Sequence, residues 1–337
     1  KDFLHRKDIE ISVKRYGIDA LGAMAQGLFA SLLIGTIIST LGEQLGIGIL
    51  VTVGGYAKGA TGAAMAVSIG VALQCPPLVL FSLAAVGMAA NELGGAGGPL
   101  AVLVVTIFAA EFGKLVSKET KIDIIVTPFV TICVGVLLSL GCAPAIGAAA
   151  STVGTAIMWA TELQPFFMGI IVSVIVGIAL TLPISSAAIC AALSLTGLAG
   201  GAAVAGCCAQ MIGFAVMSFR ENRWGGVVAQ GLGTSMLQMG NICRKPQIWI
   251  APTLAAAVCG PVSTMLFKLE CTGINAGMGT CGLVGPIGVV MSTENTAMMW
   301  IGILVSCFVL PAVLSFVFNE ILRKIGLVKT GDMKIDV

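Results

Sequence analysis

Two short polar segments each place a carboxylate beside an amide in an otherwise apolar chain. They are residues 161–165 (TELQP) and 292–296 (STENT). A carboxylate accepts hydrogen bonds and an amide both donates and accepts them, so together they suit vicinal hydroxyls of a carbohydrate. Both segments also fit the alternative of a helix N-cap at an interfacial turn. The candidate substrate ligands from these segments are Glu162, Gln164, Thr293, Glu294 and Asn295.

A third candidate region is the glycine-rich stretch 272–286 (TGINAGMGTCGLVGP). Its five glycines disfavour a stable helix. Because lipid cannot satisfy exposed backbone groups, such a segment has to be buried in protein or line a watery cavity, unless it is a flexible surface loop. Its apolar side chains favour the cavity, as in the midplane sites of transporters. The candidate ligands here are Asn275, Gly277, Gly279 and Thr280.

Isolated amides form the last group of candidates. Gln238 and Asn241 lie at the end of a short apolar run. Such side chains either line a substrate path or hydrogen-bond across helices. Eleven cysteines without a CxxC pair give no metal-ligand spacing. We expect no catalytic residue, no metal site and no cofactor.

Composition decides what kind of fold positions these residues. The 337 residues are 57% hydrophobic and only 10% charged, and the mean hydropathy is +1.03. Soluble domains carry about 25% charged residues, so this chain could not cover a water-facing surface. Its long apolar runs predict helices spanning a bilayer. The net charge of +2 implies no nucleic-acid partner; membrane lipid is the expected surrounding.

The pattern along the chain predicts an all-α integral membrane protein with about ten transmembrane helices. Residues 1–17 read as an amphipathic interfacial helix, and 327–337 as a cytoplasmic tail. Lysine and arginine clusters place both termini in the cytoplasm. Two short segments, near 184–198 and 270–293, are then left over as re-entrant hairpins.

Within the apolar runs, glycine and proline suggest interruptions. The run 47–73 contains adjacent glycines and a lysine, so a broken or tilted helix is expected. Residues 122–140 read as one span, and 144–160 as a separate short span or amphipathic piece beginning at a proline.

Several stretches resemble a bacterial family of phosphotransferase-system EIIC-type membrane proteins. The resemblance is carried by residues 182–186 (LPISS), 209–215 (AQMIGFA), 218–222 (SFREN), 229–236 (AQGLGTSM), 245–255 (KPQIWIAPTLA) and 277–285 (GMGTCGLVG). It implies a fold similar to the glucose superfamily, with about ten spans, two re-entrant hairpins and a homodimer in the bacterial plasma membrane.

The resemblance also implies an activity. Residues 18–160 would form a scaffold-like half, and 161–326 a transport-domain-like half with the hairpins. A carboxylate near a hairpin would bind the hydroxyls of a sugar-like or amphipathic small molecule, which moves across the membrane by alternating access. Because no phosphoryl-carrying domain is fused to the chain, phosphorylation would depend on separate IIA and IIB proteins.

A second function stays open on the same scaffold. Some members of this branch resemble a membrane regulator of toxin expression. The chain would then be a membrane-embedded ligand sensor without transport.

Overall fold

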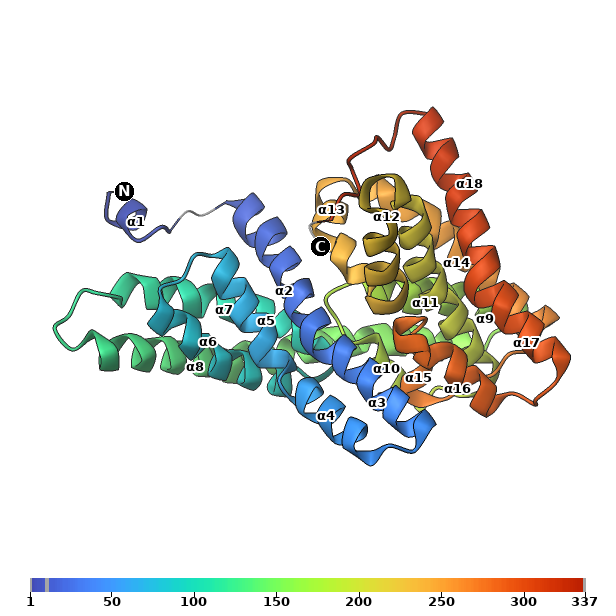
Figure 1. Ribbon diagram of the computed structural model, residues 1–337, viewed down its shortest axis with the longest axis horizontal. Helices are drawn as coiled ribbons and strands as arrows, with labels where there is room; N and C mark the ends of the chain where they lie inside the picture. Colours follow the sequence, from blue (N-terminus) through green and yellow to red (C-terminus); the bar gives the residue numbers. More distant parts are fainter. Residues whose placement is uncertain (1, 10–11, 336–337) are drawn as a thin grey trace. The chain divides into compact units, whose positions relative to one another are not determined.

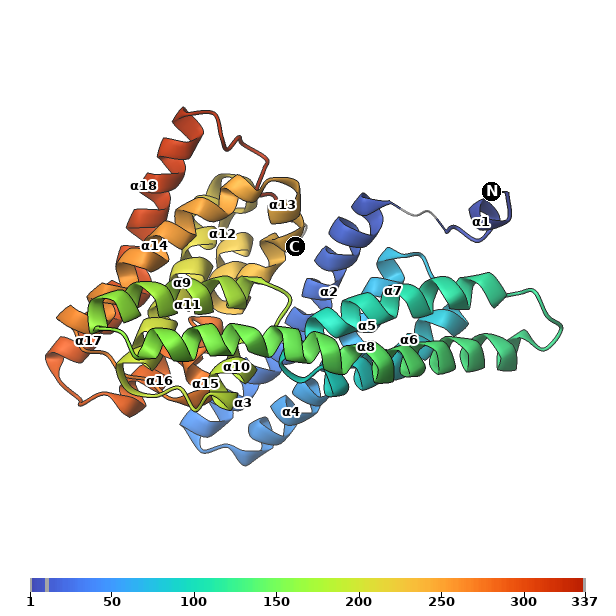
Figure 2. The same cartoon turned by 180° about the vertical axis from the view of Figure 1, so that it is seen from behind.

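The structure, a computed structural model, is built from helices. It describes residues 2–9 and 12–335, and every regular element within these ranges is helical. The chain forms two compact units, Lys1–Ala150 and Ser151–Val337, whose elements are labelled in Figure 1 and seen from behind in Figure 2.

The first unit is a bundle in which small residues let the helices approach closely. Gly62 of one helix faces Gly87 of the next, and Gly35 faces Gly54 in the same way. Pro76 and Pro77 end the preceding helical run and begin a new one. The helices of this unit are α1 (Asp2–Arg6), α2 (Ala20–Leu28), α3 (Ile34–Leu45), α4 (Gly48–Gly59), α5 (Thr61–Ala72), α6 (Pro77–Gly94) and α7 (Gly98–Val116), followed by α8 (Asp123–Thr161), with π-helical turns at Arg15–Asp19 and Phe29–Leu33 and a 3₁₀ turn at Gly95–Gly97.

Within the described residues, six helical stretches are long and apolar enough to cross a membrane, which fits a multi-pass membrane protein. One of them, Pro77–Val116, is a hairpin: the chain turns at Gly95, which has a φ of +49°, and α6 then packs along α7. Each helix of this pair has the length of a single crossing. The count of about ten spans stays a prediction.

Three expectations about local structure can be compared with these helices. The run 47–73 is broken, as predicted, between α4 and α5. The predicted division at residues 141–143 is wrong, because α8 continues through Pro128 and Pro144 as one helix of 39 residues. The N-terminal helix is shorter than predicted: α1 ends at Arg6, and Asp8 has a φ of +53° that a helix does not accommodate. Residues 10–11 of that prediction lie outside the described ranges.

The second unit is organised around α11, which is almost completely buried. Helices α9, α14 and α18 pack on it from different sides (Figure 1, Figure 2). The helices of this unit are α9 (Pro165–Thr181), α10 (Ser186–Ala192), α11 (Gly197–Met217), α12 (Phe219–Val228), α13 (Met239–Arg244), α14 (Ile250–Pro261), α15 (Gly273–Ala276), α16 (Val284–Ser292), α17 (Ala297–Ile303) and α18 (Leu310–Lys324), with π-helical turns at Ala229–Gly233, Val262–Leu266 and Leu304–Val309 and 3₁₀ turns at Ser235–Gln238, Pro246–Trp249 and Cys281–Leu283.

Glycines set the spacing between α9, α11 and α14. The backbone of Gly206 faces Ser173 so closely that a Cβ at position 206 would overlap the Ser173 carbonyl oxygen. Gly260 lies in the same way against Gly169. The Ser173 hydroxyl donates a hydrogen bond of 2.8 Å to the Ala256 carbonyl, which ties α9 to α14. Because lipid gives no hydrophobic drive for helix association, this close packing and hydrogen bonding hold the unit together.

We predict that Gly206→Ala lowers the stability of the protein by about 1–3 kcal/mol, because the added methyl group forces α9 away from α11. Thermal unfolding in detergent, followed by size-exclusion chromatography, measures the change. Gly55→Ala is the control, since a Cβ there meets open space. Equal melting temperatures for the two variants would contradict this account of the packing.

Candidate substrate-binding site

The two segments that were predicted as hairpins lie against each other in the second unit. The Gly273 amide donates to the Leu195 carbonyl at 2.8 Å, and the Cys271 amide donates to the Gly197 carbonyl at 3.2 Å. The Ser186 hydroxyl, at the start of α10, donates to the Gly277 carbonyl at 2.8 Å. The irregular backbone of each segment therefore finds hydrogen-bond partners in the other, as burial without water requires.

Residues 270–293 form a closed loop with a buried tip. At its ends, the Thr293 hydroxyl accepts from the Glu270 amide at 2.9 Å and donates to the Glu270 carbonyl at 3.1 Å. At the tip, the Thr280 hydroxyl donates to the Gly231 carbonyl at 2.5 Å. Gly279 has a φ of +56° and no room for a side chain beside Cys207. The glycines thus permit a turn packed against α11, and the alternative of a flexible surface loop is wrong for this tip.

A cavity of about 440 Å³ opens beside the segment 184–198, a size suited to a small-molecule ligand. The end of α8 and the start of α9 form one wall, and the connection from α10 to α11 forms the other. Three hydroxyls, those of Thr161, Ser194 and Thr196, line it among mostly apolar side chains. Ser194 has a φ of +48°, a sparsely populated conformation of the kind that clusters at binding sites.

Glu162 and Gln164 alternate along the chain with residues that line this cavity, but neither is itself a lining residue. Thr161, Leu163 and Pro165 line it, and the side chains of Glu162 and Gln164 are exposed. Gln164 precedes α9 without making a side-chain cap, so the N-cap alternative does not account for this amide. The cavity itself therefore offers three hydroxyls to a polyhydroxylated ligand, and the carboxylate and the amide are exposed on the same connection outside its lining.

The second polar segment lies in the exposed turn between α16 and α17. Glu294 is exposed there, whereas the Asn295 side-chain oxygen accepts from the Trp300 indole at 3.0 Å. The N-cap of α17 is Thr296, whose hydroxyl accepts from the Met299 amide. Thr293 closes the loop to Glu270. The alternative of a capping turn therefore describes this segment well, and only Glu294 presents an available charge.

Gln238 and Asn241 hold a distant part of the chain. Their amide nitrogens donate to the carbonyls of Met333 at 2.9 Å and Lys334 at 2.8 Å, and the two side chains are joined at 2.8 Å. Asn222 also donates to the Met333 carbonyl at 2.8 Å. These contacts favour a structural role for both amides, which hydrogen-bond to other parts of the chain, over a role in lining a substrate path. They also fix the described part of the predicted tail to the second unit; residues 336–337 lie outside the described ranges.

Sequence reasoning missed several residues that shape the site. Ser186 and the 193–199 connection carry no carboxylate or amide, so nothing in residue type alone marked them. The buried Gln210 hydrogen-bonds across helices: its amide nitrogen donates to the Thr253 hydroxyl at 3.2 Å and its oxygen accepts from the Trp249 indole at 3.0 Å. A signal for Ser186 was present in the Pro-Ile-Ser-Ser stretch, a typical helix start.

We predict that Gln238→Leu releases the segment 328–335, because the Met333 carbonyl and the neighbouring amides lose a buried partner worth about 1–3 kcal/mol. Hydrogen exchange should become at least several-fold faster in this segment. Gln44→Leu is the control, since Gln44 is exposed in the first unit. If exchange at 328–335 is the same in both variants, the amides do not hold the segment.

Comparison with known proteins identifies one family. The family model described as "Phosphotransferase system, EIIC" matches residues 18–335, which is nearly the whole chain. No curated protein matches the sequence, and no solved structure matches it either.

Proposed function

Because the chain belongs to the phosphotransferase-system EIIC family, we propose that it is a membrane permease component for a small carbohydrate-like substrate. The observation that carries this proposal is the cavity at residues 158–168 and 193–199, whose wall at the start of α9 belongs to the same connection as the exposed Glu162 and Gln164. Carboxylate, amide and hydroxyl groups bind sugar hydroxyls, and the apolar wall fits the C–H faces of a sugar ring.

The hairpin contacts connect this cavity to the glycine-rich loop. A ligand beside Ser194 and Thr196 touches the connection whose Leu195 and Gly197 carbonyls accept from residues 271 and 273. In our proposal, binding stabilises one arrangement of both hairpins, and alternating access follows from their joint movement. The substrate path is then formed or supported by residues of the glycine-rich loop, namely Asn275, Gly277, Gly279 and Thr280. Glu294 contributes a second carboxylate from its exposed turn.

The proposal includes partners and a setting. A separate IIB-type protein, itself supplied by a IIA protein, transfers the phosphoryl group to the substrate. The proposed assembly is a homodimer in a bacterial plasma membrane with both termini in the cytoplasm.

We predict that a panel of sugars raises the melting temperature of the purified protein, and that Glu162→Gln weakens binding of the responding sugar about 10-fold or more. The reason is the loss of a charge-assisted hydrogen bond. The variant Glu294→Gln tests the second carboxylate in the same assay. Glu43→Gln, an exposed carboxylate of the first unit, is the control. No shift with any sugar, or equal affinity in Glu162→Gln and the control, would contradict the proposed site.

A membrane-embedded ligand sensor is the second candidate function. The mostly apolar lining of the cavity favours it, since such a lining also suits an amphipathic signal. Counterflow in vesicles decides between the two functions: a carrier exchanges the responding sugar across the membrane, whereas a sensor binds it without exchange.

A further inference from the structure

The first unit contains a second cavity, of about 470 Å³, with a strongly basic lining. Four cationic side chains line it, those of Arg6, Lys7, Lys114 and Lys118. The acidic residues in its lining are Asp8 and Glu119. It lies at the end of α7 and in the loop before α8, the connection between two candidate membrane spans. Nothing in the proposed transport function uses it.

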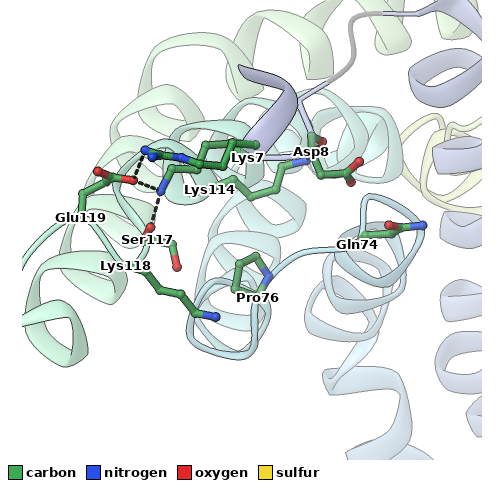
Figure 3. A pocket seen from close by; sticks show the side chains of 9 residues that line it. Lys7, Asp8, Gln74, Pro76, Lys114, Ser117, Lys118 and Glu119 are labelled. Atoms are coloured by element: carbon green, nitrogen blue, oxygen red, sulfur yellow. Dashed lines mark hydrogen bonds and ion pairs between the residues drawn. The ribbon is translucent and has the colours of Figure 1, made fainter. Parts of the chain in front are cut away.

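Two of the cations are buried and fix the shape of this cavity. The Lys114 side chain is only 1% exposed, pairs with Glu111 at 3.0 Å, and donates to the carbonyls of Asp8 at 2.8 Å and Leu73 at 3.2 Å. The Lys7 ammonium donates to the Ser117 carbonyl at 2.5 Å and pairs with Glu119 (Figure 3). These contacts dock the N-terminal segment onto the loop after α7.

The acids near the cavity already have partners. Glu119 pairs with both Lys7 and Arg6, and hydrogen bonding to Lys7 holds the pKa of that carboxyl below its usual range, so it stays ionised at neutral pH. Asp8 pairs with Arg15. A fourth carboxylate, Asp123, accepts from the Lys118 amide at 2.6 Å. Counting Arg15, Glu111 and Asp123 with the lining residues, five cations face four carboxylates, which leaves an excess of one positive charge at the site.

That excess is located on Lys118. Among the residues that the structure describes, its ammonium has no hydrogen-bond or ion-pair partner, and Figure 3 shows it extending away from the Lys7–Glu119 pair and toward Pro76. Asp8, Gln74 and Lys118, which all line the cavity, each have a positive φ, of +53°, +56° and +61°. Three non-glycine residues held in the left-handed region around one cavity indicate a shape that the surrounding contacts impose.

Exposed apolar side chains lie beside these cations. Phe3 and Leu4 of α1 are 44% and 40% exposed, and the Arg6 guanidinium lies 5.1 Å from the centre of the Phe3 ring. An aromatic residue next to arginine and lysine at the end of a membrane span is typical of a contact with lipid headgroups. Guanidinium and ammonium groups together suit the oxygens of a phosphate.

We propose that this basic cavity binds a phosphate group, with Lys118 and Arg6 as the accessible ligands and Lys7 and Lys114 as the buried cations behind them. The phosphate has two possible sources, the headgroup of an anionic phospholipid and a free phosphate anion. The site is formed by residues of the first unit alone, and the phosphate adds to the contacts of Lys7 and Lys114 that already dock the N-terminal segment onto the loop between α7 and α8.

The test compares the parent with the double variant Arg6→Gln/Lys118→Gln. Both side chains are exposed, and Lys7 keeps Glu119 paired, so the variant should fold. The control variant Lys324→Gln/Lys329→Gln removes two exposed charges from the second unit. Melting temperatures without added anion verify that all three proteins are folded. If the double variant does not fold, the single variant Lys118→Gln replaces it.

Native mass spectrometry from a neutral detergent measures retention of phosphatidylglycerol against phosphatidylcholine. The melting temperature in inorganic phosphate, compared with that in chloride at equal ionic strength, measures binding of the free phosphate anion. We expect at least one anion to bind the parent and the control, and to bind the double variant more weakly by roughly 5-fold for each cation removed. Selective loss of phosphatidylglycerol identifies the lipid source, and loss of the phosphate shift identifies the free anion. If neither anion distinguishes the double variant from the control, the proposal is wrong.

Discussion

Backbone groups that are not in a helix need partners inside the protein wherever water is excluded, and the second unit depends on meeting that requirement. Its two irregular segments meet it jointly. Gly273 and Cys271 donate to the connection after α10, Ser186 donates to Gly277, and Thr280 donates to the turn after α12. Each segment alone would leave these groups unsatisfied at a cost of several kcal/mol. The two segments therefore form one structural element rather than two loops.

This constraint explains where the candidate substrate cavity lies. The connection after α10 has to stay irregular so that its carbonyls accept from residues 271 and 273, and an irregular connection leaves space between itself and the start of α9. Close glycine contacts among α9, α11 and α14 provide the rigid background. A ligand in the cavity thus contacts an irregular connection whose carbonyls are already hydrogen-bonded to the second irregular segment.

Composition was sufficient to predict a helical membrane protein, and glycine content together with segment length was sufficient to predict which segments are irregular. Pro144 misled the division of α8, because a proline within a membrane helix is tolerated where neighbouring groups satisfy the freed carbonyl. The contacts of Gln238 and Asn241 were not predictable, since their partners lie more than 90 residues away in the sequence. Glu162 as a substrate ligand stays a prediction, and the cavity lined by its neighbours depends on a tertiary contact that no local pattern encodes.

The central claim is that the two irregular segments act as one element that responds to substrate. Amide hydrogen exchange at Cys271 and Gly273, measured with and without the sugar that binds, tests this claim most directly. We predict that both amides exchange as slowly as the ends of the neighbouring helices in the free protein, and more slowly still when the sugar is bound. Exchange at the rate of an open loop, or protection that the sugar leaves unchanged, would contradict the account.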